Sequence, residues 1–255
     1  MLNKMNDLDE KIKQAVDIIT KSKHAIVYTG AGISVESGIP PFRGDDGLWN
    51  KYDPKYLDLD YFFNNPYKSW IVIKEIFYNF FGNARPNAAH IGLAEMEKMG
   101  LVKAIVTQNI DNLHTEAGSN EVYEFHGNSR ELVCLKDNSR YKISDVNLDE
   151  LPPKCEKCGE VLKPDFIFFG EQIPEVAYRK SFEAARNCDV VIVVGSTGEV
   201  IPAAYVPQLA KQDGAFILEI NPKKSYFTDS ITDLFLQGKA SDIIAKMSNQ
   251  LKIIK

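Results

Sequence analysis

The sequence predicts an α/β protein built on a doubly wound, Rossmann-like parallel sheet, with a smaller inserted domain. Short apolar runs rich in β-branched residues recur along the chain, and helical patterns separate most of them. Runs that are apolar on both faces and alternate with helices are typical of a parallel sheet covered on each side.

The elements follow one another in a regular order. The first is an amphipathic helix, whose apolar residues recur at helical spacing from Leu8 to Ile19 behind Asp7, a suitable cap. The run HAIVYTGAG follows and is stopped by glycines. Further strand-like runs lie at residues 102–107, 122–125, 166–169, 190–194 and 215–220. Helical patterns lie at residues 88–99, 174–187 and 202–211, and a last helix starts near Ser241.

Two segments interrupt this alternation. One is an aromatic-rich helical stretch at residues 61–81, and the other is a polar stretch with cysteines at residues 131–163. We therefore expect a Rossmann-like domain from residues 1–40, 96–130 and 164–255. The helical insertion 41–95 and the zinc-ribbon-like insertion 131–163 should form the small domain.

Composition excludes several classes of function. The 255 residues are 44% hydrophobic and 25% charged, and the net charge of -5 leaves no basic stripe for direct nucleic-acid binding. Four cysteines without an apolar leader argue against secretion and favour the cytoplasm. The longest apolar run, VVIVVG, is far shorter than the roughly 18 to 20 residues of a membrane span, so we expect no membrane partner.

The stretch TGAGISVESGIPPFRG, residues 29–44, carries the first chemical signal. A strand ending in Gly30-Ala31-Gly32 lets the backbone approach a pyrophosphate, and a following helix directs its N–H groups at the anion. The full dinucleotide fingerprint needs a glycine at position 35, where this chain has Val35. Taken alone, the glycines fit either a nucleotide loop or a tight strand-to-helix turn.

The longer pattern GAGIS…SGIP-x-FRG resembles the nucleotide loop of the sirtuins, the NAD-dependent protein deacylases. Further motifs follow in the order of that family: TQNID at 107–111, EFHG at 124–127, KPDFIFFGE at 163–171, GST-x-x-V-x-PAA at 195–204 and EIN at 219–221. The resemblance covers nearly the whole chain after the first helix. It implies NAD as a cosubstrate and acyl-lysine proteins or peptides as partners.

The resemblance also implies a reaction. In sirtuins an acyl-lysine carbonyl oxygen attacks C1′ of the NAD ribose and expels nicotinamide, and the 2′-hydroxyl then takes the acyl group. The products are free lysine, nicotinamide and O-acyl-ADP-ribose. A base near the ribose hydroxyls is needed, and a histidine with a near-neutral pKa suits that task.

Site residues are carried over from the family motifs. His126 of EFHG is the expected catalytic base and Asn109 the second catalytic residue, whereas His24, His90 and His114 are expected to have structural or packing roles. The expected substrate-binding residues are Phe169, Gly170, Glu171, Gly198, Glu199 and Val200. The expected cofactor-binding residues are Gly30, Ala31, Gly32, Ser34, Glu36, Pro40, Phe42, Arg43, Trp49, Gln108, Asn109, Ile110, Asp111, Gly195, Ser196, Thr197, Asn221, Pro222 and Ala240.

Two other functions stay open at this stage. The same NAD cleavage could serve an NAD hydrolase or a mono-ADP-ribosyltransferase, although the intact peptide-pairing segments FGE and V-x-PAA favour the deacylase. A non-catalytic NAD-binding module is the second alternative. Retention of His126 with Asn109 and Asp111 argues against it, because a pure binder has no need for a base at the ribose.

The resemblance also limits which acyl groups we expect as substrates. One branch of the family removes acidic acyl groups with a Tyr and an Arg three residues apart, on the helix that begins at a tryptophan. Counted from Trp70, those positions are Ile73 and Ile76, which cannot pair with a carboxylate. We expect acetyl and long apolar acyl chains to be accepted and acidic ones to be poor substrates. The alternative is that both isoleucines are ordinary core residues.

The stretch CEKC has the two-residue spacing with which paired thiolates bind a metal. In the family this insertion carries two Cys-x-x-Cys pairs around a structural zinc. Cys134 matches the first ligand and Cys155 and Cys158 the second pair, while Asp137 stands at the place of the remaining thiolate. Three thiolates and one carboxylate can bind zinc. An insertion that no longer depends on metal is the open alternative, and Cys188 is expected to be a small buried apolar residue.

Overall fold

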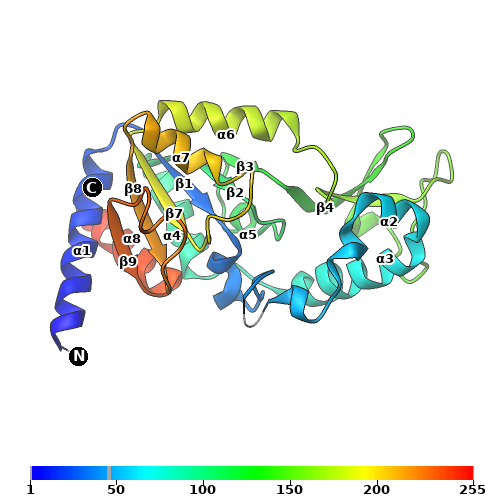
Figure 1. Cartoon of the computed structure of the whole chain (residues 1–255), viewed down its shortest axis with the longest axis horizontal. Coiled ribbons are helices and arrows are strands. Elements are labelled where there is room, and N and C mark those ends of the chain that lie inside the picture. Colours follow the sequence, from blue (N-terminus) through cyan, green and yellow to red (C-terminus); the bar gives the residue numbers. More distant parts are fainter. Residues whose placement is uncertain (1, 45–46, 255) are drawn as a thin grey trace.

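The structure is a computed structural model that describes residues 2–44 and 47–254. Its largest unit is a six-stranded parallel sheet in the order β3-β2-β1-β7-β8-β9 (Figure 1). The strands are β1 (Ala25–Thr29), β2 (Val102–Thr107), β3 (Val122–Glu124), β7 (Val190–Val194), β8 (Phe216–Asn221) and β9 (Leu234–Gln237). The two central strands β1 and β7 are buried at every position, which explains why their sequences are apolar on both faces.

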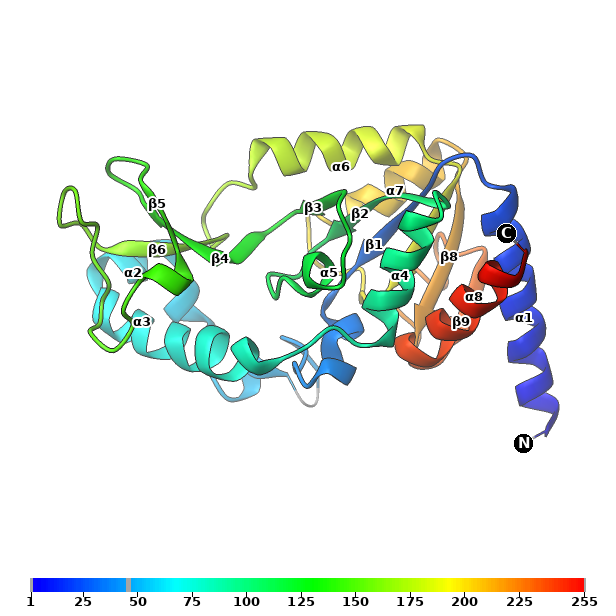
Figure 2. The ribbon, with the colours of Figure 1, turned by 180° about the vertical axis from the view of Figure 1, so that it is seen from behind.

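Helices cover both faces of this sheet, so the predicted doubly wound fold is confirmed. One face packs against α1 (Leu2–Lys21), α4 (Ala88–Lys98) and α8 (Ala240–Ile254), as Figure 2 shows. The other face packs against α6 (Glu175–Asn187) and α7 (Tyr205–Gln212). A buried hydrophobic cluster fills each of these two layers.

A three-stranded antiparallel sheet forms the rest of the molecule with a set of short helices. Its order is β5-β4-β6, and Trp70 ties the helices to it by donating from Nε1 to the carbonyl oxygen of Leu162 at 2.8 Å. Aromatic side chains such as Phe77 and Phe166 fill a third core. The elements are β4 (Gly127–Cys134), β5 (Arg140–Lys142), β6 (Leu162–Phe166), α2 (Leu59–Asn64), α3 (Pro66–Ile73) and the π-helical turns Lys74–Phe80.

The strand order reverses its direction of growth between β1 and β7, which is the position where open α/β sheets bind ligands. The loops that follow these two strands touch through their backbones. Gly32 donates its N–H to the carbonyl oxygen of Gly195 at 2.9 Å, and a Cβ atom at Gly32 would lie 2.7 Å from that same oxygen. Gly195 itself has a φ of 63°. Only glycine satisfies this contact.

Several expectations about single elements were wrong. The run 166–169 is not a strand of the parallel sheet, because the strand there is β6 (Leu162–Phe166) in the antiparallel sheet. Asp7 does not cap the first helix, which begins at Leu2. The helix expected after the glycine loop is a 3₁₀ helix, Ala31–Ser37. The stretch 61–81 is broken near Asn65 and Pro66, because proline cannot continue the preceding helix. Strand β9 was not predicted.

The remaining described helices are short. They are α5 (Leu113–Glu116) and the 3₁₀ turns Leu48–Asn50, Pro54–Leu57, Phe81–Asn83 and Ile143–Asp145. Across residues 2–44 and 47–254, no helix has both the length and the apolar character that crossing a membrane requires.

Replacing Gly32 by alanine should destabilise the fold. The added Cβ would collide with backbone atoms of Gly195, which have no rotamer with which to move away, so we expect a loss of about 1–3 kcal/mol in the free energy of unfolding. Urea denaturation measures this. Gly82→Ala is the matched control, because its Cβ would meet no described atom within 4 Å, and it should change stability by less than about 0.5 kcal/mol. Equal stability of Gly32→Ala and wild type would contradict the role of this contact.

Candidate active site and metal centre

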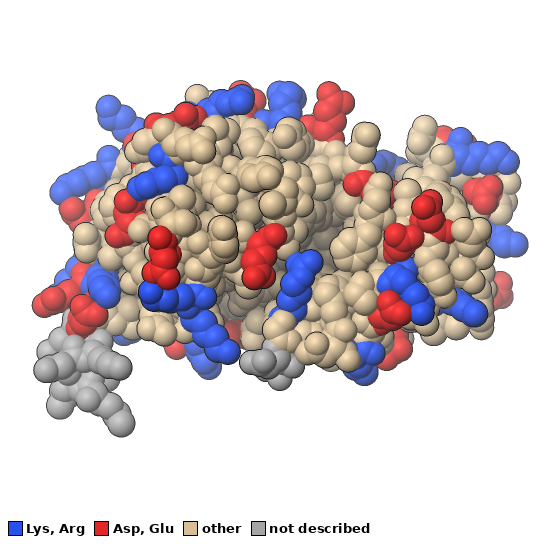
Figure 3. Space-filling view, viewed as in Figure 1, with Lys and Arg blue, Asp and Glu red and all other residues tan. Residues whose placement is uncertain are grey.

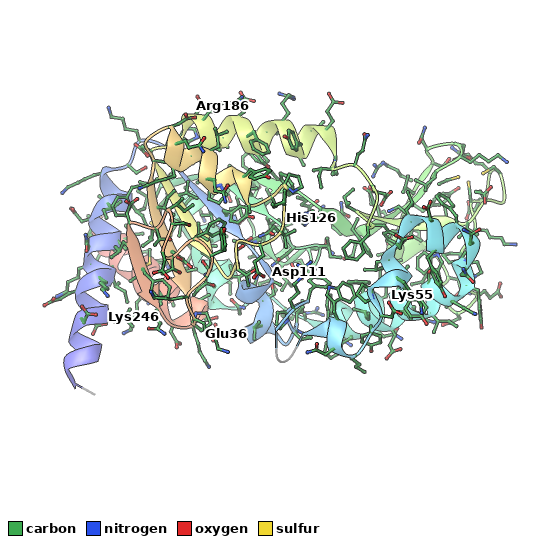
Figure 4. All side chains as sticks on the ribbon, in the orientation of Figure 1. Glu36, Lys55, Asp111, His126, Arg186 and Lys246 are labelled. Carbon is green, nitrogen blue, oxygen red and sulfur yellow. The ribbon has the colours of Figure 1, made fainter. Side chains whose placement is uncertain are left out.

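His126 lies between β3 and β4, at the carboxyl-terminal edge of the parallel sheet. Its Nδ1 atom is 3.0 Å from the carbonyl oxygen of Gln108, the residue that follows β2. Burial lowers the pKa of His126, and the contact with Gln108 opposes that shift. Figure 4 shows His126 and Asp111 in the middle of the molecule, between the two sheets. The face in Figure 3 is hollowed in the same region.

Asn109 and Asp111 are fixed by Ser34, which comes from the loop after β1. The Nδ2 group of Asn109 donates to Ser34 Oγ at 3.2 Å and to the carbonyl oxygen of Gly30 at 3.3 Å. Ser34 donates to Asp111 Oδ2 at 2.6 Å. Burial raises the pKa of Asp111, and the hydrogen bond from Ser34 opposes the shift. The TQNID motif and the glycine loop therefore form one hydrogen-bonded unit.

Two buried histidines lie behind this unit. The rings of His90 and His114 meet edge to face at 4.9 Å, and His90 Nε2 is 3.4 Å from Ser34 Oγ. His114 Nε2 is 3.0 Å from the hydroxyl of Thr29, which in turn donates to Thr107. Burial lowers the pKa of His90 to about 4 and holds the pKa of His114 well below its usual value. Both rings are therefore neutral near pH 7.

The polar residues at the ends of β2, β7 and β8 are also joined. Gln108 Nε2 donates to Ser196 Oγ at 3.1 Å, and Asn221 Nδ2 donates to the carbonyl oxygen of Ser196 at 3.1 Å. Asn221 is oriented by Glu219, whose buried carboxylate accepts from Asn221 and from the hydroxyls of Ser225, Thr228 and Thr232. Ser196 is thus held from both sides.

Other expected cofactor residues line the rim of the same edge. Glu36 accepts the N–H of Ser241 at 3.0 Å, which places it beside Ala240 at the start of α8. The rings of Phe42 and Trp49 lie 5.3 Å apart, and Trp49 lies 6.2 Å from Phe169. Ile110 is buried, Ala31 and Pro40 are half-buried, and Arg43, Thr197 and Pro222 are exposed.

The segment Phe169 to Glu171 is tied to its surroundings by a buried ion pair. Glu171 accepts the N–H of Phe168 at 2.6 Å, and its carboxylate lies 3.0 Å from the Nζ atom of Lys163. Lys163 is only 2% exposed and donates to the carbonyl oxygens of Pro164 and Phe166. The Glu171 carboxylate is therefore already bonded to groups of its own segment and of Lys163. Phe169, in contrast, is 46% exposed.

The second expected substrate segment follows β7. Gly198 has a φ of 78°, and a Cβ atom there would lie 3.1 Å from the ring of Phe227, so glycine is favoured at this position. Glu199 is exposed and Val200 half-buried. The Val200 carbonyl oxygen accepts the N–H of Ala204 at 2.9 Å, which fixes the segment to the start of the next turn.

The quoted motifs contain three further residues that support the site, although no role was predicted for them. Glu219, Lys163 and Thr29 are buried polar residues that orient Asn221, Glu171 and His114 respectively. A single charged residue inside an apolar strand, as in FILEIN, was a usable signal, because a charge is buried only when it is paired.

The cysteine-bearing stretch forms a compact cluster at the far end of β4. One ligand atom from each of Cys134, Asp137, Cys155 and Cys158 lies within 4.8 Å of the others. Cys134 and Cys158 have their sulfurs 3.5 Å apart, and Cys155 Sγ is 3.4 Å from Asp137 Oδ2. β4 runs eight residues from Gly127, next to His126, to Cys134, so about 24 Å of extended strand separate the cluster from the histidine.

Comparison with known proteins identifies the family. The model of the Sir2 family matches residues 30–202, more than half of the 255-residue chain. The chain belongs to the Sir2 family. This Sir2-family chain is 44% identical over 240 residues to NAD-dependent protein deacylase 2 of Pyrobaculum aerophilum, a match that covers 92% of this chain and 94% of that protein. With NAD-dependent protein deacylase 2 of Archaeoglobus fulgidus it shares 42% identity over 254 residues, 97% of this chain and 99% of that one.

Solved Sir2 structures have the same fold. A Sir2 homologue in complex with NAD superposes with a TM-score of 0.88 at 38% identity, over 95% of this chain and 94% of that one. A complex of Sir2 with a p53 peptide and NAD+ superposes with a TM-score of 0.88 at 33% identity, over 95% of this chain and 99% of that one.

The four-residue cluster of this Sir2-family chain fits zinc. In a tetrahedral site, ligand atoms about 2.0–2.3 Å from the metal lie about 3.3–3.8 Å apart, close to the two separations given above. Asp137 is oriented by the N–H of Ser139, which donates to its other carboxylate oxygen at 2.9 Å. The position of Asp137 is therefore compatible with a fourth ligand.

We predict one zinc ion per chain in purified protein, measured by elemental analysis. Asp137→Ala should lower zinc retention and the melting temperature, because it removes one of four ligands, whereas Asp137→Cys should raise retention by restoring four thiolates. Asp149→Ala, at an exposed carboxylate outside the cluster, is the control. Protein that stays folded and active with zinc near zero would show instead that packing alone holds this insertion.

Proposed function

We propose that this chain is an NAD-dependent protein-lysine deacylase that yields nicotinamide, free lysine and O-acyl-ADP-ribose. The observation that carries the proposal is the position of His126 in a Sir2-family chain. Its ring is fixed against Gln108, the residue before Asn109, at the carboxyl-terminal edge of the parallel sheet. Relatives at 40–44% identity over most of the chain are NAD-dependent protein deacylases.

NAD would be held along the carboxyl-terminal edge of the sheet. The glycine loop, Ser196 and Asn221 are the proposed contacts of the nucleotide, and Gln108, Asn109 and Asp111 those of the nicotinamide ribose and carboxamide. These groups are already joined by hydrogen bonds. Little ordering is therefore required when NAD binds, which favours affinity.

His126 is the proposed general base for the ribose hydroxyls. Burial keeps its imidazole neutral, and a neutral ring can accept a proton at the atom that does not face Gln108. Ser34 and the carbonyl oxygen of Gly30 orient the side chain of Asn109.

The substrate peptide would lie as an added strand between residues 169–171 and 198–200. This mode of binding relies on backbone hydrogen bonds and tolerates many side chains. The p53 peptide complexes of related Sir2 proteins support a peptide as partner. Because the Glu171 carboxylate is engaged by Lys163 and Phe168, we propose that Glu171 contributes its backbone and not its side chain.

Positions 73 and 76 would offer no cation to an acyl chain. Ile73 and Ile76 are buried in the third core with Trp70. A carboxylate at the end of an acyl chain would find no cation from these two positions, and burying an unpaired charge is unfavourable.

An acyl-peptide panel tests this function. We expect kcat/KM for acetyl and myristoyl versions of one peptide to exceed that for the succinyl version by at least about tenfold, because the cost of an unpaired carboxylate is more than about 1.4 kcal/mol. Mass spectrometry of the O-acyl-ADP-ribose product measures each reaction. Preference for succinyl would contradict the expected absence of a cation at the acyl end. Nicotinamide release from NAD at the same rate without peptide would identify an NAD hydrolase instead.

His126→Ala should lower deacylation by about 10² to 10⁴-fold while NAD binding stays measurable by calorimetry. His24→Ala, outside the site, is the control. Because burial lowers the pKa of His126, the base form persists below pH 6.5, and kcat/KM should stay level as the pH falls through 6.5 and decline only at lower pH. Full turnover by His126→Ala, or an acid limb centred above pH 6.5, would exclude His126 as the base.

A further inference from the structure

A groove lies on the surface between α6 and α7, outside the site described above. It encloses about 460 Å³, which is within the range of ligand-sized cavities. Tyr178 and Phe182 from α6 and Tyr205 and Leu209 from α7 supply aromatic and apolar surface. Arg179 and Arg186 add two cations, and two glutamines of α7 complete the lining. Figure 1 shows the two helices side by side.

Both walls of the groove begin at the proposed peptide-binding segments. Helix α6 starts at Glu175, four residues after Glu171, and α7 starts at Tyr205, five residues after Val200. An extended peptide that leaves the space between these two segments on the helix side would therefore enter the groove directly.

Ring contacts place the near end of the groove beside the proposed base. The rings of Tyr178 and Phe182 are 4.5 Å apart, and both contact Phe125, at 6.0 and 6.4 Å. Phe125 precedes His126 in the chain, and its ring meets the imidazole edge to face at 5.5 Å. A single aromatic ring thus separates the groove from the reaction site.

The cations of the groove are available to a ligand. Arg179 and Arg186 are seven residues apart, two turns of α6, and so lie on one helical face. In the described part of the chain Arg186 makes no hydrogen bond or ion pair, and Figure 4 shows it near the end of α6 away from His126. Arg179 pairs with Glu183 at 3.6 Å, but both side chains are more than 60% exposed, so this pair is weak.

Two lysines near the groove are already paired with acidic residues. Lys180 pairs with Glu121 at 3.9 Å, and Lys211 pairs with Asp233 beyond the far end. The guanidinium groups point to carboxylates as partners, because arginine binds them through paired N–H donors. The tyrosines and Leu209 point to an apolar or aromatic residue beside the carboxylate.

We propose that the groove between α6 and α7 binds the segment of the protein substrate that flanks the acyl-lysine, and that it selects acidic residues there. This inference rests on the proposed deacylase function. The 13 residues of α6 span about 20 Å, a length that about six extended residues would fill. Substrate choice then comes from the flanking sequence, since backbone pairing at the acyl-lysine discriminates little.

Matched peptides test the groove. A short acetyl-lysine peptide is extended by seven residues on its amino or its carboxyl side, with either three Glu or three Gln among the same apolar residues. Binding of fluorescein-labelled peptides is measured by anisotropy at low and at physiological salt, and kcat and KM are measured with NAD. For one of the two sides, we expect the Glu extension to bind about tenfold more tightly than the Gln extension. This difference in affinity should become smaller as the salt concentration increases.

Two double variants test whether the arginines of the groove cause the preference for the Glu extension. Arg179→Gln/Arg186→Gln should remove the advantage of the Glu extension and leave kcat/KM for the short peptide unchanged. Lys246→Gln/Lys252→Gln makes the same change of net charge on α8, across the sheet, and should keep the advantage. Equal affinity for the Glu and Gln extensions on both sides, or an equal loss in both double variants, would overturn the inference. Failure to deacylate even the short peptide would reject the deacylase function, while the anisotropy result would still decide the groove.

Discussion

The backbone contact between the loops after β1 and β7 is the constraint on which the site depends. Gly30 donates its N–H to Val194, Gly32 donates to Gly195, and Gly195 donates to Ile220, so three strand ends are joined through main-chain groups alone. A side chain at Gly32 or Gly195 would separate these loops. Ser196 and Ser34 follow directly from them, and through these two hydroxyls the positions of Gln108, Asn109 and Asp111 are set.

Buried polar pairing then makes the site rigid. Glu219 accepts hydrogen bonds from four side chains, and Lys163 is surrounded by two carbonyl oxygens and a carboxylate. Removing one partner from such a group leaves an unpaired polar atom in a medium of low dielectric constant, which costs more than a surface bond contributes. Asn221 and the segment around Phe169 therefore keep one orientation.

The sequence predicted the sheet well where burial alone decides structure, as in β1 and β7. It failed for residues 166–169, because an apolar run does not reveal whether its partner strand is parallel or antiparallel. It also missed β9, a four-residue strand at the edge of the sheet.

His126 was found through its motif, since an isolated histidine carries no periodic signal. Glu219 and Lys163 lie in quoted motifs, but their buried supporting roles were not predicted, because hydrophobic patterns treat charged residues as exposed. The division of the chain into two domains stays a prediction.

The candidate active site and the cysteine-bearing cluster share one strand. β4 begins beside His126, where the carbonyl oxygen of His126 accepts the N–H of Ile167, and it ends at Cys134. The same strand pairs with β6, which carries Lys163 and leads to Phe169. A metal at Cys134 would fix one end of β4 against Cys155 and Cys158, and so limit fraying of the small sheet. Its influence on His126 would pass through the strand ladder, about 24 Å away, and not through charge, because a field over that distance is screened by salt. With metal bound, the cluster would therefore control the stability of the small sheet, and the chemistry would depend on it only through the position of β4.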